Sequence, residues 1–160
     1  MLYRELDSPI GPLLLAGDEY GIRYLLFGNG RRRTTPAAAW MPDRDTLEEP
    51  ARQLSAYFAG TLRNFELALA PEGTPFQRAV WNELQRIPYG ETISYAELAK
   101  RIGNPKAVRA VGLANGSNPI AIVIPCHRVI GATGALVGYG GGLPSKQALL
   151  ALERGERRLL

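Results

Sequence analysis

The sequence of 160 residues predicts an α+β protein in two parts, a small α/β domain over residues 1–70 and a mainly helical domain over residues 74–160. Three observations support this expectation. Short apolar segments separated by turn formers, which are typical of strands, fill the first 30 positions. Capping residues that precede apolar runs at helical spacing recur in the second part. Between the two, the segment APEGTP at 70–75 has the Pro and Gly content of a linker.

Three segments near the N-terminus are expected to form an antiparallel meander. They read LYREL, PLLLA and IRYLLF, and the turn signals SPIG and GDEYG lie between them. Residues 28–45 contain many turn formers and no apolar period, so a surface loop is expected there. The segment RNFELAL, residues 63–69, is a candidate for one more strand.

The first part should also contain a helix over residues 46–58. Thr46 and Glu49 have the spacing of a capping box, and apolar residues follow at helical spacing. Gly60 lies where a helix of this length would end.

The second part is expected to begin with a helix at Pro75. Thr74 is the predicted N-cap, and Gln77 has the spacing that closes a capping box. Pro88 and Gly90 end this helix.

Two more short helices follow, joined by a tight turn. Ser94 and Glu97 form a predicted capping box ahead of YAELAKRI, and Gly103 ends that helix. Asn104 and Pro105 are expected to start the next one, KAVRAVGLA. This pattern matches helix-turn-helix geometry, which many helical hairpins that do not bind DNA share.

The third of these helices is poorly equipped to read base sequence. A major-groove reading helix needs side chains that pair with base edges, and only Lys106 and Arg109 are long and polar here. Small side chains let the backbone approach DNA closely, which favours shape-based contact in a shallow groove. Packing against the neighbouring helix is the alternative explanation. The small residues considered for contact are Ala107, Ala110 and Ala114.

Composition and charge restrict the class of protein. The net charge of +4 comes from the second part, because residues 1–70 carry −1 and residues 71–160 carry +5. A polyanion would therefore bind the second part, although many basic domains touch no nucleic acid. No apolar run reaches the roughly 20 residues of a membrane span, and the N-terminus lacks a signal-peptide pattern. A cytoplasmic protein without membrane contact is expected.

The sequence contains one cysteine, Cys126, and one histidine, His127. One cysteine cannot form an internal disulfide, and this pair cannot supply the four ligands of a structural zinc site. No metal and no cofactor are therefore expected. The thiol should be reduced, and it is either inert or chemically active.

The segment before the cysteine, IAIVIP at 120–125, is expected to be a buried strand that Pro125 ends. A lone cysteine is usually structural. Adjacent residues in a strand also point to opposite faces, so His127 could serve Cys126 only if the chain turns or a water bridges them.

The string NPIAIVIPCHRVIGATG, followed by GYGGG, closely resembles the active-site region of the O6-alkylguanine-DNA alkyltransferases. These DNA-repair proteins transfer an alkyl group from guanine to their own cysteine, once per molecule. The likeness covers essentially the whole chain and is strongest from Thr74 to Glu153. It implies a ribonuclease-H-like first domain, a winged helix-turn-helix in the second, and methylated-DNA–protein-cysteine methyltransferase activity.

The resemblance also implies roles for individual residues. Cys126 is the alkyl acceptor, His127 takes its proton through a water, and Glu153 orients the imidazole. Asn118 corresponds to a hinge asparagine that ties the helix-turn-helix to the active-site segment; the residues alone are equally compatible with a simple turn before a proline. Arg128 is expected to brace the structure.

Contacts with DNA and with the flipped base follow from the same likeness. Arg109 corresponds to an arginine that fills the space left by the extruded base, and Tyr95 to a tyrosine that meets this base. The remaining DNA contacts would come from Lys106 and from the alanines at 107, 110 and 114. The pocket would consist of the Val129 carbonyl, Tyr139 and the loop at Gly140, where many family members have serine.

The expected partner is double-stranded DNA that carries O6-alkylguanine, with O4-alkylthymine as a second candidate lesion. A monomer is expected, with self-association on DNA as an open alternative. Three other functions compete. A lesion-binding relative without chemistry would lack Cys126, a helix-turn-helix regulator would prefer an operator sequence, and a thiol hydrolase would turn over an ester.

Overall fold

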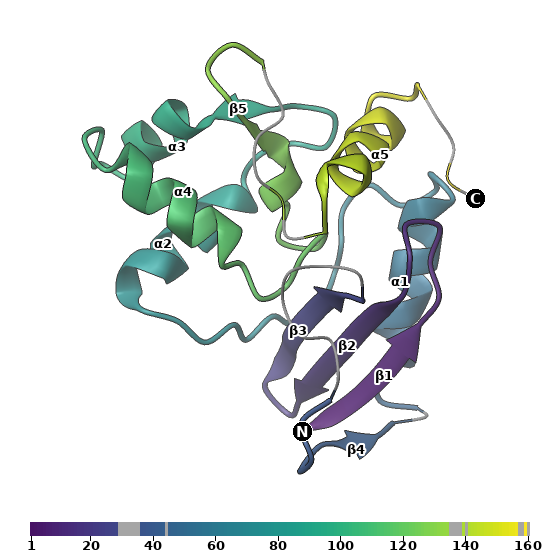
Figure 1. Cartoon of the computed structure of the whole chain (residues 1–160). Coiled ribbons are helices and arrows are strands. Elements are labelled where there is room, and N and C mark those ends of the chain that lie inside the picture. Colours follow the sequence, from purple (N-terminus) through teal and green to yellow (C-terminus); the bar gives the residue numbers. More distant parts are fainter. Residues whose placement is uncertain (29–35, 44, 135–138, 140, 157–158, 160) are drawn as a thin grey trace.

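The computed structural model describes residues 1–28, 36–43, 45–134, 139, 141–156 and 159. Figure 1 shows the strands of the first part on one side of the molecule and helices α2, α3 and α4 on the other. Helix α5 (Leu143–Glu153), the last element of the chain, lies above the end of α1 (Glu48–Phe58) (Figure 1). The C-terminal end of the chain therefore returns to the first part.

The predicted meander is confirmed. Strands β1 (Leu2–Leu6), β2 (Leu13–Asp18) and β3 (Gly21–Phe27) pair antiparallel in sequence order. A two-residue strand, β4 (Met41–Pro42), pairs parallel with β1 and completes the order β3-β2-β1-β4. This strand lies inside the predicted loop at 28–45, and two residues are too few to show a period of two. Residues 29–35 and 44 of that loop lie outside the described part.

The helix predicted at 46–58 is present as α1, but its capping box is wrong. The Asp43 carboxylate accepts hydrogen bonds from the backbone N–H groups of Thr46 and Leu47, at 3.2 and 2.7 Å. Glu49 instead binds side chains within the helix. The Asp43 carboxylate thus binds the chain just before the helix, and the N-cap residue, Leu47, has no capping side chain.

The predicted strand at 63–69 is also wrong. Only Leu69 forms a bridge there, an isolated parallel one with Ile22. Alternating apolar residues suit any segment that packs one side on a core, so the pattern did not distinguish a strand from an irregular segment.

Helix α2 (Pro75–Leu84) has the complete predicted capping box, formed by Thr74 and Gln77. Helix α3 (Tyr95–Arg101) has half of one. Ser94 accepts a hydrogen bond from the N–H of Glu97 at 3.0 Å, but the Glu97 side chain binds Arg101.

Helix α4 (Val108–Gly116) begins later than predicted. Asn104 starts a turn, in which its carbonyl accepts the N–H of Ala107, and the helix follows this turn. Residues 106 and 107 therefore lie before the helix, on the turn between α3 and α4.

The predicted strand at 120–125 is wrong, although the segment is buried as expected. Ile120 forms an isolated bridge with Leu25, and the chain then turns through Ile122 at φ 71°. A 3-10 helix, η1 (Cys126–Arg128), follows. An apolar run indicates burial but cannot separate a buried turn from a strand. Strand β6 (Val129–Ile130) then pairs parallel with β5 (Ile93–Ser94).

The two parts of the chain share one hydrophobic cluster. It contains side chains of β2, β3 and α1 together with side chains of α2 to α5. Backbone hydrogen bonds also cross between the parts, because Leu25 donates to Pro119 at 2.9 Å and accepts from Ala121 at 3.1 Å. In the described part of the chain, no helix is long and apolar enough to cross a membrane.

Candidate active site

Cys126 is the first residue of η1, and its side chain is buried, with 7% of the residue exposed. The backbone turns here, because the N–H of Arg128 donates to the carbonyl of Pro125 at 3.0 Å. Cys126 and His127 are therefore not placed on opposite faces of a strand. The geometric objection to their cooperation does not apply.

His127 is completely buried and bound to Glu153. The two atoms, His127 Nε2 and Glu153 Oε2, are 2.8 Å apart, so the imidazole carries its proton on Nε2 and donates it to the carboxylate. Its other nitrogen, Nδ1, is buried and has no hydrogen-bond partner among the described residues. Burial lowers the pKa of His127, and Glu153 opposes this effect. The ring is thus neutral near pH 7 and has one free acceptor.

Glu153, at the end of α5, is also held by a cation. Arg128 donates from Nε to Oε1 at 2.7 Å and from a terminal nitrogen to Oε2 at 3.0 Å. Another Arg128 nitrogen donates to the carbonyl of Ile87 at 2.7 Å. Burial alone would raise the pKa of Glu153, but hydrogen bonds and charges from His127 and Arg128 outweigh it and lower the pKa. The carboxylate therefore stays ionised.

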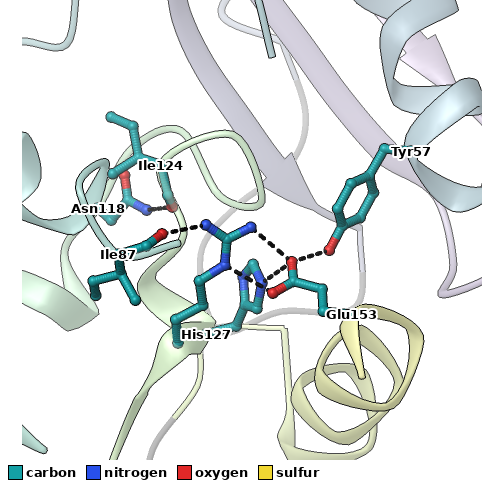
Figure 2. Close-up of polar contacts among 7 residues, drawn as sticks. Tyr57, Ile87, Asn118, Ile124, His127 and Glu153 are labelled. Carbon is teal, nitrogen blue, oxygen red and sulfur yellow. Dashed lines mark hydrogen bonds and ion pairs between the residues drawn. The ribbon is translucent and has the colours of Figure 1, made fainter. Parts of the chain in front are cut away.

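One donor to this carboxylate comes from the first part of the chain and has no counterpart in the sequence predictions. The Tyr57 hydroxyl, on α1, donates to Glu153 Oε2 at 2.6 Å (Figure 2). The two residues are 96 positions apart, and no local pattern links them. A buried tyrosine in a helix is most often a core residue, and the position of Tyr57 in the helix sequence indicates nothing more than that.

The environment of the Cys126 thiol contains opposing effects. Burial raises the pKa of the thiol, while the Asn118 side chain and the Lys146 ammonium oppose this rise. Lys146, on α5, is fully buried and donates from Nζ to the carbonyl of Val129 at 2.7 Å. Lys146 was also missed, although it lies two helical turns before Glu153, on the same face of an apolar helix.

Asn118 links the end of α4 to the active-site segment. Its Nδ2 donates to the carbonyl of Ile124 at 2.7 Å, and its Oδ1 accepts the N–H of Ile120 at 3.0 Å. A second buried asparagine, Asn115, donates to the carbonyl of Cys126 at 3.4 Å and was not predicted. Both amides hold the backbone on either side of the thiol.

The predicted pocket residues that the structure describes lie in the surroundings of Cys126. Tyr139 is half-buried, its ring packs on Phe27 with the ring centroids 5.5 Å apart, and desolvation together with the neighbouring Cys126 raises its pKa. The Val129 carbonyl, as noted, accepts a hydrogen bond from Lys146. Gly140 lies outside the described residues.

The predicted DNA contacts divide into two groups. Lys106, Arg109 and Ala110 are exposed, and Ala107 and Tyr95 are half-buried. Ala114 is buried instead, and the indole N–H of Trp81 donates to its carbonyl at 2.9 Å. For Ala114 the structure therefore agrees with packing against the neighbouring helix. An exposed apolar residue, Leu113 on α4, was missed and has 73% of its surface exposed.

The described residues contain no group of three His, Cys, Asp or Glu side chains that could hold a metal ion. The same 3-10 helix thus carries a buried thiol and a neutral imidazole, and a carboxylate orients the imidazole. A histidine held in this way can remove the thiol proton and so generate the nucleophilic thiolate.

Comparisons with known proteins agree with this geometry. Residues 75–155 match the family model of the 6-O-methylguanine DNA methyltransferase DNA binding domain, and residues 1–71 match that of its ribonuclease-like domain. The expected α+β fold, with a ribonuclease-like part before the DNA-binding part, is thereby confirmed.

Individual relatives are similar over nearly their whole length. The methylated-DNA–protein-cysteine methyltransferase of Methanosarcina acetivorans is 58% identical over 153 residues, which cover 96% of this chain and 98% of the relative. That of Mycolicibacterium paratuberculosis is 55% identical over 152 residues, 95% of this chain and 92% of the relative. The crystal structure of Mycobacterium tuberculosis OGT in complex with DNA is 52% identical, with a TM-score of 0.92, over 99% of this chain and 96% of that one. The chain therefore belongs to the 6-O-methylguanine DNA methyltransferase family.

Proposed function

We propose that this chain repairs double-stranded DNA by moving the alkyl group of O6-alkylguanine onto Cys126. The observation that carries this proposal is the turn at η1, which contains both the buried Cys126 and the imidazole that Glu153 holds. Names of close relatives support the class of reaction, since they are called methylated-DNA–protein-cysteine methyltransferases. A similar protein from Mycobacterium tuberculosis forms a complex with DNA, which supports DNA as the partner.

The chemical step is a single displacement. The thiol proton passes through a bridging water to His127 Nδ1, and Glu153 stabilises the resulting imidazolium. The Cys126 sulfur forms a bond to the alkyl carbon while the bond from that carbon to guanine O6 breaks. Guanine leaves with the electron pair and takes up a proton, for which Tyr95 is the proposed donor. A thioether has no good leaving group, so each molecule reacts once.

The base must leave the duplex before it can reach a buried sulfur. Taking a base out of the stack costs a few kcal/mol, and the exposed Arg109 guanidinium is proposed to fill its place. Lys106, Ala107 and Ala110 would contact the backbone nearby. The flipped base would meet the Val129 carbonyl, Tyr139 and the backbone at Gly140, while Asn118 keeps the thiol segment attached to α4.

The finer features of the partner are part of the same proposal. O4-alkylthymine is a second candidate lesion, and the chain acts as a monomer unless DNA brings copies together. The cytoplasm is the proposed compartment, because the reaction consumes a reduced thiol.

A repair assay with one substitution tests the proposal. A duplex with one O6-methylguanine is incubated with excess protein, and the methyl group remaining in the DNA is measured. The unmodified chain should remove it completely, and Cys126→Ala should remove none while still binding the duplex. Repair by Cys126→Ala would refute the assignment, and so would an unmodified chain that leaves the lesion intact.

A further inference from the structure

Among the described residues, three donate hydrogen bonds to Glu153 Oε2, and one of them lies outside the DNA-binding part of the chain. His127 and Arg128 supply two, at 2.8 and 3.0 Å, and the Tyr57 hydroxyl supplies the shortest, at 2.6 Å. In Figure 2 the Tyr57 ring and the His127 ring lie on different sides of the Glu153 carboxylate. The carboxylate is therefore fixed from two parts of the fold.

The Tyr57 ring is held in place by its neighbours. It is fully buried, and its centroid lies 5.6 Å from that of Phe58, 5.3 Å from Phe65 and 6.2 Å from Tyr89. Burial, reinforced by the charge of Glu153, raises the pKa of Tyr57 well above its ordinary value. The phenol therefore stays protonated and acts as a donor to the carboxylate at any pH at which the protein is folded.

A hydrogen bond to a carboxylate stabilises its negative charge. Because Tyr57 and His127 both bind Glu153 Oε2, the hydrogen bond from the phenol reduces the negative charge that this oxygen offers to the imidazole. The phenol thus weakens the hold of Glu153 on the imidazole proton, and it also prevents the carboxylate from rotating away from Nε2. Both effects act on the group that is proposed to accept the thiol proton.

We infer that Tyr57 is a positioning residue for alkyl transfer: its hydroxyl fixes Glu153 and lowers the basicity of His127, so that the ribonuclease-like part takes part in the chemistry. This inference rests on the proposed function. Three charged groups act on His127 among the described residues, Glu153 and Lys146 from α5 and Arg128 from η1, and the neutral Tyr57 of α1 acts through the carboxylate. Only the Tyr57 contribution can be removed by deleting a single oxygen from a neutral side chain.

The variant Tyr57→Phe tests this, with free O6-benzylguanine as substrate so that DNA binding does not enter the result. Without the phenol, the charge of Glu153 acts more strongly on the imidazole, so the pKa of His127 rises. The limb of the pH–rate profile that requires neutral His127 should move to higher pH. Transfer at pH 7.5 should be about tenfold slower, as expected for the loss of one hydrogen bond to a charged group.

Tyr89→Phe is the matched control. It removes a hydroxyl from the same aromatic cluster, while the contacts of the ring with Tyr57 and Arg128 can remain. Its pH–rate profile should equal that of the unmodified chain. A Tyr57→Phe protein with lower stability but an unchanged profile would mean that Tyr57 only fills the core, and would overturn the inference.

The chain contains one histidine, so its ring titration can be followed by NMR without assignment ambiguity. The midpoint should lie higher in Tyr57→Phe than in the unmodified chain. Should this variant not fold, site-specific 3,5-difluorotyrosine at 57 keeps the shape with a stronger donor, and the midpoint should then fall. No shift with either residue would overturn the inference. If benzyl transfer to Cys126 fails in the unmodified chain, it is the proposed function that fails.

Discussion

Cys126 is surrounded by groups that act on its thiol in opposite directions. Burial disfavours the thiolate, and the fully buried ammonium of Lys146 favours it. A buried cation costs free energy unless it is paired or hydrogen-bonded, and Lys146 donates to the Val129 carbonyl. The position of this charge, next to the only cysteine of the sequence, suggests that it lowers the barrier to forming the thiolate.

Lys146→Met tests this at the residue scale, because Met has a similar length and volume but no charge. Removing the ammonium removes an effect that lowers the pKa of Cys126, so the pKa should rise further. The rate of benzyl transfer should then be about tenfold lower at pH 7, and its thiolate-dependent limb should lie at higher pH. Lys100→Met, at an exposed position, is the control. Equal pH profiles for the two variants would contradict the electrostatic role.

The sequence and its likeness to a family point to the proposed reacting pair and to Asn118, but not to Tyr57 or Lys146. Cys126, His127 and Glu153 follow from a specific motif and its likeness to a family. Tyr57 and Lys146 could not be found in this way, because their significance depends on contacts between distant positions, which composition and spacing do not encode. For Lys146 the sequence contains one indication, a charged residue on the apolar face of a helix. For Tyr57 it contains none.

Helix α4 is the element on which the DNA proposal depends. Its exposed residues include Arg109 and Leu113, which are one turn apart and therefore lie on the same face. Ala114 points inward, so only part of the predicted small-residue surface is available to DNA. The face is suited to close contact rather than to pairing with base edges.

Arg109→Ala should separate base extrusion from chemistry. Repair of a duplex should slow by about tenfold or more, because the vacancy in the stack is no longer filled, while the reaction with free O6-benzylguanine should be unchanged. Lys106→Ala removes a cation from the turn before the same helix, and should weaken DNA binding without changing the rate at saturating DNA. Equal losses of Arg109→Ala on both substrates would count against its proposed role.

Helix signals in the sequence predicted the presence of the helices better than their caps. Thr74 and Gln77 form the predicted box, since both lie within the first turn. At α1 the N-cap is Leu47, which has no capping side chain, and Asp43 binds the N–H groups just before the helix in place of the predicted Thr46 box. The buried run at 120–125 shows a related limit, because its apolar residues indicate that the segment is buried but do not predict the turn at Ile122.

At the scale of the whole molecule, the two parts share their core. The hydrophobic cluster crosses the predicted boundary, and Tyr57–Glu153 and the backbone bonds of Leu25 add polar contacts across it. The domain boundary at residues 70–74 stays a prediction. The shared packing predicts that both parts unfold together as one cooperative unit. Sequence alone could not reveal this, because each part has its own elements and its own apolar pattern.

Denaturant unfolding tests the cooperativity, because each part has one tryptophan, Trp40 and Trp81. Trp40→Phe leaves a probe in α2, and Trp81→Phe leaves one in the first part. In each variant the fluorescence midpoint should coincide with the circular dichroism midpoint, as for two-state unfolding. Separate midpoints within one variant would show that the two parts unfold independently. This result would count against a coupling of the two parts through Tyr57.

The most direct measurement of the central claim is peptide mass mapping after reaction with a duplex that carries deuterated O6-methylguanine. The account predicts one labelled methyl group per chain, bound to the sulfur of residue 126, and no further uptake when fresh duplex is added. A label on any other residue, or release of methylated product with repeated turnover, would contradict it.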